Sequence, residues 1–101
     1  MGKVRYVVVQ QNGQEIVEEI HKVVLHRFSV GDAEDPDLYA AQPLYDWEHS
    51  EQGQFVMKNS KTQPEWNRYL DHTTFGYRYA ITAELEKKKL SEYLLKWGPI
   101  K

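Results

Sequence analysis

Apolar and polar residues alternate most regularly between residues 75 and 85. The aromatic and aliphatic side chains of this stretch occupy every second position: Phe75, Tyr77, Tyr79, Ile81, Ala83 and Leu85. Because successive side chains of a strand point to opposite faces, this pattern predicts a strand with one buried face. The beginning of the chain is also typical of a strand, since residues 4–9 are β-branched or aromatic except for Arg5.

A tight turn follows this first strand. Asn12-Gly13 is a pair that accepts positive φ at both central positions, as a type I′ hairpin turn requires. We therefore predict a hairpin whose second strand runs over residues 14–20. The expected cross-strand pairs are Gln11 with Gln14, Val9 with Ile16, Val8 with Val17, and Tyr6 with Glu19.

Residues 14–27 also admit a helix, because apolar residues recur there at helical spacing. The residues concerned are Ile16, Val17, Ile20, Val23 and Val24. Three of these five are valines, which are poor helix formers, and the Asn-Gly pair adds weight to the hairpin. The favoured interpretation has a bend near residues 21–22 and a further strand over residues 23–30.

The centre of the chain predicts helices. Asp35 and Pro36 suit the N-cap and first position of a helix, with a first turn at residues 38–41 anchored by Leu38 and Tyr39. A second helix is expected over residues 43–57, opening at Pro43. Its inner stripe is Leu44, Trp47 and Phe55. Gly53 weakens this helix by roughly 1 kcal/mol relative to Ala, so a break or a close packing contact is expected there.

The remaining segments give weaker signals. Residues 59–74 are polar and contain Pro64 and Trp66, which predicts a long loop with at most one helical turn. Residues 87–91 are expected to form a helical turn that leads into a strand near residues 92–97. A helix over this last segment remains an alternative, since several residues match helical spacing: Glu86, Leu90, Tyr93, Leu94 and Trp97. Gly98-Pro99 is expected to end the ordered structure.

These elements together predict an α+β fold, in which a small antiparallel sheet of four or five strands packs against the helix of residues 43–57. The length of 101 residues predicts one domain. The expected core residues are Val7, Val9, Val24, Phe28, Leu44, Trp47, Phe55, Tyr77, Tyr79, Ile81, Leu85 and Leu94.

Composition narrows the range of functions. The net charge of −2 hides an acidic half (residues 1–50, four basic and nine acidic side chains) and a basic half (residues 51–101, nine basic and six acidic). Such asymmetry can give a dipolar surface through which two copies meet.

The chain has no cysteine, which excludes disulfides, thiolate metal sites and a cysteine nucleophile. Without cysteine the chain does not resemble a small secreted disulfide scaffold, so a reducing compartment is expected. No apolar run predicts a membrane span or a signal peptide.

Catalytic and metal-binding patterns are weak. Four carboxylates lie within residues 32–37, but the spacing of an EF-hand loop is absent, and Asp35-Pro36 is better explained as a helix start. The four histidines are scattered, and Asp71-His72 lacks a positioned nucleophile. Neither a nucleophile elbow nor a glycine-rich phosphate loop is present. We therefore expect no enzyme activity, no cofactor and no metal.

The basic half also contains aromatic residues, and this combination is typical of single-strand nucleic-acid binders. Tyr77 and Tyr79 share the predicted buried face. The residues left for contact with a partner or a nucleic acid are Trp66, Arg68, Tyr69, Arg78, Lys87, Lys88 and Lys89.

The segment from Phe28 to Ala41 (FSVGDAEDPDLYAA), with Trp47, Ser50-Glu51 and Gly53, resembles small proteins of T4-like tailed phages, cyanophages especially. Further elements of the likeness are Pro64-Glu65-Trp66, Asp71, Phe75-Gly76-Tyr77 and Leu94-Leu95-Lys96-Trp97. The resemblance covers about residues 23–97. It implies a viral source, and hence the host cytoplasm or the virion, but no activity and no site residues.

The function expected from these observations is that of a small, non-enzymatic viral accessory or structural protein. It would act through contacts with another protein, either a second copy or a host or phage protein. Exposed sheet edges pair readily, so a homodimer is a natural form of such contact. The alternative is a nucleic-acid-binding accessory protein.

Overall fold

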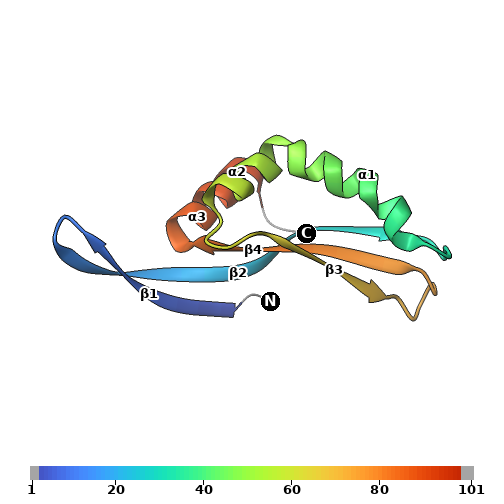
Figure 1. Cartoon of the computed structure of the whole chain (residues 1–101), viewed down its shortest axis with the longest axis horizontal. Helices are drawn as coiled ribbons and strands as arrows, with labels where there is room; N and C mark the ends of the chain where they lie inside the picture. Colours follow the sequence, from blue (N-terminus) through green and yellow to red (C-terminus); the bar gives the residue numbers. More distant parts are fainter. Residues whose placement is uncertain (1–2, 99–101) are drawn as a thin grey trace.

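The protein folds around a four-stranded antiparallel sheet in the order β1-β2-β4-β3 (Figure 1). The computed structural model describes residues 3–98. The strands are β1 (Lys3–Gln11), β2 (Gln14–Val30), β3 (Glu65–Leu70) and β4 (Tyr77–Glu86), and the helices are α1 (Pro36–His49), α2 (Glu51–Asn59) and α3 (Lys87–Trp97). All three helices contribute to the core on one face of the sheet. The α+β class predicted from the sequence is therefore confirmed.

The N-terminal hairpin forms with the predicted register. Gln11 lies opposite Gln14, Val8 opposite Val17, and Tyr6 opposite Glu19. The turn has φ of 51° at Asn12 and 77° at Gly13, the positive values that an Asn-Gly pair accepts most readily. Residues 14–27 are thus strand, and the helical alternative is excluded.

β2 is longer than predicted and has no bend at residues 21–22. It continues through to Val30, and its ladder with β4 is irregular only between Val24 and His26. The extra residue is Leu25, which is buried in the core. A bulge inserts one residue and increases the local twist, so the strand stays continuous and coils instead of breaking.

The helix predicted over residues 43–57 is wrong in its boundaries. Pro43 lies inside α1, which begins at Pro36 with Asp35 as N-cap, and the break comes at Ser50. The Ser50 hydroxyl donates to the Trp47 carbonyl (2.6 Å) and accepts from the Gly53 N–H (3.0 Å). One serine therefore ends α1 and begins α2, which the spacing of apolar residues could not reveal.

Gly53 makes the close contact that the sequence suggested. A Cβ built at this position would overlap the carbonyl oxygen of Trp47 and lie 2.9 Å from that of Glu48. The glycine allows the first turn of α2 to pack directly on the last turn of α1.

Two predicted elements are wrong. The predicted loop over residues 59–74 contains β3, which pairs with β4 although all of its residues are exposed. Residues 87–97 form one helix, α3, in place of a turn and a strand. Gly98 ends this helix with φ of 79°, while Pro99 lies outside the described residues. β3 escaped prediction because it buries no face. The helix α3 is the alternative that the helical spacing of residues 86–97 had left open.

The core lies between the sheet and the three helices. Its buried members are Leu25, Trp47, Val56, Ile81, Ala83, Leu85 and Tyr93. Tyr79 is also fully buried, as predicted, and Leu44 and Phe55 pack at the margin. The prediction was wrong for Leu94, which is 37% exposed, because α3 turns Tyr93 inward instead. Leu38, Tyr39 and Phe75 are exposed as well, so none of them anchors the core.

Five more of the predicted core residues are only half-buried: Val7, Val9, Val24, Phe28 and Tyr77. Val7 and Val9 belong to the hairpin and lie outside the core cluster, whereas Phe28 stacks on Tyr79 with ring centroids 5.1 Å apart. By the alternation of β2, Val24 lies on the sheet face that the helices leave open.

Candidate interaction surfaces

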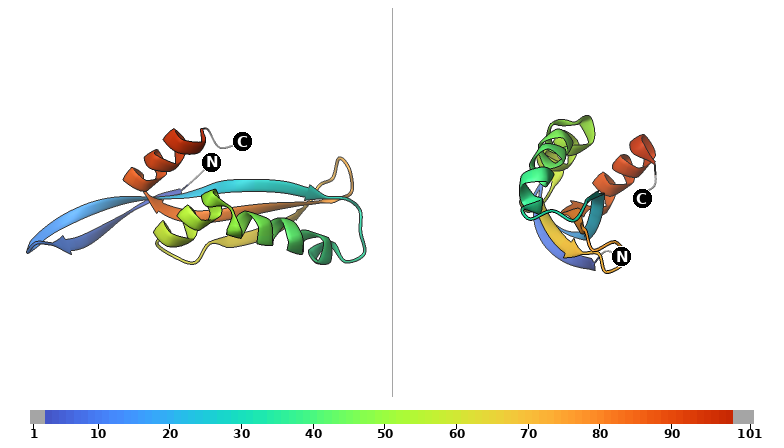
Figure 2. Two further views of the ribbon diagram at one scale, coloured as in Figure 1. Left: turned by 90° about the horizontal axis from the view of Figure 1, so that it is seen from above. Right: turned by 90° about the vertical axis from the view of Figure 1, so that its right-hand side faces the viewer.

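The β1–β2 hairpin extends beyond the rest of the sheet (Figures 1 and 2). β4 pairs with β2 only from Ile20 onward, so β1 is the only strand in the described chain that pairs with residues 14–19 of β2. This stretch projects by roughly 20 Å at the usual rise of ~3.3 Å per residue. The molecule is elongated as a result, with extents of 54 × 25 × 22 Å. We call residues 6–19 the arm.

One face of the arm carries three exposed apolar side chains, set among Gln10, Glu15 and Glu19. Tyr6, Val8 and Val17 are 68%, 60% and 63% exposed. By the alternation of β2, Val17 lies on the same face as Val23, which packs against the core under the helices. The sheet face that the helices cover in the body therefore continues into the arm, where these apolar side chains are uncovered.

The arm also has a free edge along β1. In a two-residue hairpin the residues that flank the turn form a hydrogen-bonded pair, and such pairs alternate with non-hydrogen-bonded ones. Gln11 and Gln14 flank this turn, so the odd-numbered residues of β1 bond to β2. The backbone groups of the even-numbered residues point outward: Val4, Tyr6, Val8 and Gln10.

Two ion pairs tie the base of the arm to the body. Arg5 Nε donates to Glu84 Oε2 over 2.7 Å, and Lys61 Nζ lies 2.8 Å from Glu18 Oε1. The hydrogen bond from Arg5, with help from Thr62, holds the pKa of the Glu84 carboxyl below its ordinary value. Ile20, opposite Arg5 in the ladder, is fully buried. The base of the arm is thus fixed, while its outer part makes no contact with the helices that cover the body.

The residues predicted for partner contact do not form one surface. Trp66 and Arg68 lie on the helix side of β3. The Trp66 ring is 5.7 Å from that of Tyr79, and Arg68 donates to Asp37 over 3.1 Å while its guanidinium lies 5.2 Å above the Tyr77 ring. Arg68 therefore joins β3 to α1 and is engaged within the fold.

Tyr69 and Arg78 lie together on the opposite, open face of the sheet. They are ladder partners, and with Arg27 they line a hollow of about 430 Å³ whose walls include Val24 and Ala80. Arg78 donates to the Asp71 carboxylate over 3.0 Å. The backbone N–H of Thr73, followed by Arg78, lowers the pKa of the Asp71 carboxyl. Arg27 was not singled out in the sequence, since nothing in its spacing linked it to Arg78.

Lys87, Lys88 and Lys89 form the first turn of α3, at the other end of β4 from Arg78. The separation is roughly 30 Å at the rise of a strand. The predicted set is therefore divided among the helix side of the sheet, its open face and α3. A single stacking platform built from all seven residues is excluded.

Comparisons with protein-family models, curated proteins and solved structures give no match to this chain. Among the helices of residues 3–98, none has the length and apolar character needed to cross a membrane. Within the same residues, no three His, Asp or Glu side chains are grouped so that they could hold a metal ion.

Proposed function

We propose that this protein acts through protein contacts, and that its arm joins the arm of a second copy. The observation that carries this proposal is the free edge of β1 in the arm, with the exposed apolar residues Tyr6 and Val8 along it. A two-stranded ribbon is at best marginally stable in water. Pairing with further strands satisfies its outward backbone groups and gives these side chains cross-strand neighbours.

The outward groups of β1 determine how two copies would pair. An antiparallel pair of β1 strands centred on Val7 places Tyr6 of one copy opposite Val8 of the other, and Val4 opposite Gln10. All four residues have outward backbone groups, so both pairs are hydrogen-bonded. This alignment also uses the whole of β1, Lys3–Gln11, because Val7 is its central residue.

Side chains support the same alignment. Tyr6 opposite Val8 is an aromatic–β-branched pair, which is favourable across strands. Lys3 would lie opposite Gln11, and Arg5 opposite Val9, so no like charges meet. The contact is isologous, as expected of a closed dimer.

β3, the other edge strand, is less suited to this role. It is short, running only from Glu65 to Leu70, and short edge strands are typical of edges protected from pairing. The outward positions of β1 between Val4 and Gln10 are uncharged.

The solution mass tests the proposal. Light scattering should give a mass near twice the chain mass of 11.9 kDa at high protein concentration, and it should decrease on dilution. Val8→Pro removes an outward N–H and leaves the β1–β2 hydrogen bonds in place, because the Val8 N–H points to the free edge. This variant should remain monomeric.

The matched control is Val8→Thr, which retains the N–H and a β-branched side chain and should still dimerise. A wild-type protein that stays monomeric at high concentration contradicts the proposal, and so does a Val8→Pro variant with unchanged mass. Amide exchange at Val7 and Val9 would show that the arm itself remains folded in the proline variant.

A further inference from the structure

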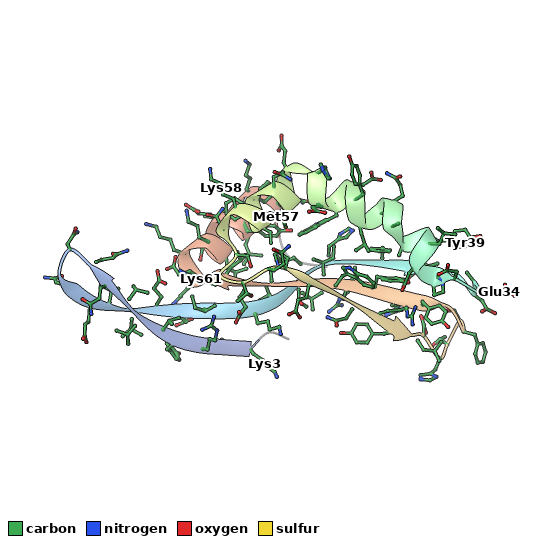
Figure 3. The ribbon with its side chains drawn as sticks, viewed as in Figure 1. Lys3, Glu34, Tyr39, Met57, Lys58 and Lys61 are labelled. Atoms are coloured by element: carbon green, nitrogen blue, oxygen red, sulfur yellow. The ribbon has the colours of Figure 1, made fainter. Side chains whose placement is uncertain are left out.

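A second surface lies on the helices, apart from the arm. α2 and α3 line a shallow hollow of about 580 Å³ that is open to solvent. Its lining residues are Glu51, Gln54, Phe55, Lys58, Asn59, Lys89, Lys96 and Trp97. Lys58 is labelled on α2 in Figure 3. The size lies in the range of small-ligand sites.

The floor of this hollow is aromatic. The rings of Phe55 and Trp97 meet edge to face, with centroids 5.6 Å apart, and Tyr93 packs against both from the core side. Trp97 is only half-buried. A base that stacks on this ring would take the place of Lys96, whose ammonium lies over it, and aromatic faces stack on bases of any sequence.

The rim of the hollow is basic. Three ammonium groups, those of Lys58, Lys89 and Lys96, are set against the single carboxylate of Glu51 among the lining residues. Lys96 Nζ lies 4.9 Å from the centre of the Trp97 ring. Lys89 pairs with Glu92 over 3.2 Å, but both side chains are largely exposed, so this pair is weak.

The first turn of α3 carries charges of the sign that a helix N-terminus disfavours. Its first turn carries Lys87, Lys88 and Lys89 and contains no acidic residue, although the start of a helix favours negative charge. Its N-cap Glu86 makes no side-chain cap bond within the described chain. Departures from local rules of this kind concentrate at functional sites, and an anion bound nearby would offset the repulsion.

From these observations we infer that the hollow between α2 and α3 binds a nucleotide. Its phosphate would be held by Lys58, Lys89 and Lys96, and its base would lie on Trp97. A lysine ammonium acts as a point charge for phosphate oxygens, whereas paired recognition of carboxylates favours arginine. The nucleotide is either free or exposed in a single strand. This inference does not rest on the proposed self-association.

Binding can be measured with a fluorescent oligo(dT) by anisotropy, using AMP, inorganic phosphate and poly-glutamate as competitors. The variant K58Q/K89Q/K96Q removes the proposed phosphate contacts. The matched control, K3Q/K22Q/K61Q, removes the same charge elsewhere on the molecule. At low salt, the first variant should lose tenfold or more in affinity, and the control less than about threefold, because phosphate contacts dominate such binding.

Salt dependence provides a second readout. The three lysines hold one phosphate, so their loss should make the slope of log affinity against log salt shallower by about 0.7, the value for each phosphate neutralised on a single strand. The variant W97F should weaken oligo(dT) binding and leave competition by phosphate unchanged. Circular dichroism establishes that each variant is folded.

The competitors identify the source of the ligand. Strong competition by AMP indicates a free nucleotide, and binding of oligo(dT) without competition by AMP indicates a single strand; either result supports the inference. Absence of binding at low salt overturns it. Equal losses in the two triple variants also overturn it, as does poly-glutamate that competes as well as oligo(dT).

Discussion

The hydroxyl of Tyr79 donates a hydrogen bond of 2.5 Å to Oδ1 of Asp37, and so joins the beginning of β4 to the first turn of α1. Arg68 of β3 donates to the same oxygen over 3.1 Å. Three elements therefore meet at one carboxylate oxygen. Burial, with Asp37 as the next cause, raises the pKa of Tyr79 to about 12, so its hydroxyl keeps the donated proton throughout the neutral range.

Tyr79→Phe should lower the free energy of unfolding by about 1–2 kcal/mol, since a hydrogen bond to a charged acceptor is lost and the ring is kept. Urea denaturation measures this change. Tyr45→Phe is the control, because Tyr45 is exposed on α1 and should have almost no effect. Equal stability of the Tyr79 variant and the wild type would show that the bond contributes nothing to folding.

Gly53→Ala should be destabilising, although alanine is ordinarily better than glycine in a helix by about 1 kcal/mol. The added methyl group overlaps the Trp47 carbonyl, and backbone cannot yield as a flexible side chain can. Gly31→Ala serves as control, since a Cβ there meets nothing within 4 Å. A Gly53→Ala protein with a raised melting temperature would contradict this packing.

His26 should make the protein sensitive to mild acid. Its ring stacks on Trp47 with centroids 6.1 Å apart, and burial lowers its pKa from the ordinary 6.5. Near and below pH 6.5, His26 therefore binds a proton more readily in the unfolded chain than in the folded one. The free energy of unfolding should decrease as the pH falls from about 7 towards 5.

In the variant His26→Gln, the free energy of unfolding should change less between pH 7 and pH 5 than it does in the wild type. The exposed His72 gives the comparison, since His72→Gln should retain the wild-type slope. Chemical denaturation at several pH values provides the measurement. If the free energy of unfolding depends on pH equally in His26→Gln and in the wild type, other groups cause the acid sensitivity.

Gly13→Ala should loosen the arm and leave the body intact. Its φ of 77° lies in the left-handed region, where a residue with a Cβ is strained by about 1–2 kcal/mol. Amide exchange should accelerate at Val7 and Val9, whose N–H groups bond to β2, but not at Ile81. Asn12→Gly, which relieves strain at the neighbouring position, should not accelerate it. Faster exchange at Ile81 in the alanine variant would show that arm and body open together.

The hairpin and β4 could be predicted because their signals are local. Asn12-Gly13 specifies the turn, the turn specifies the register, and the alternation around Ile81 specifies which side is buried. Neither conclusion required knowledge of what packs against these strands.

The other elements depend on contacts distant in sequence. β3 has no buried side, so hydrophobic alternation could not mark it, and its ladder with β4 defines it. The end of α1 depends on Ser50, which bonds to groups of both helices. The hollow on α2 and α3 brings together Lys58 and Lys96, which are far apart in the chain. Of this arrangement, the sequence indicated only the helix α3, through the helical spacing from Leu90 to Trp97.

The unbroken course of β2 has a mechanical consequence. Its hydrogen bonds to β4 run perpendicular to the strand axis, from Ile20 to Val30. A pull on the arm along that axis would load these bonds together in shear, whereas a pull across it would open them one at a time. The arm therefore resists force along the strand axis more than force across it. A load applied by a bound partner along that axis would be shared by the whole β2–β4 ladder.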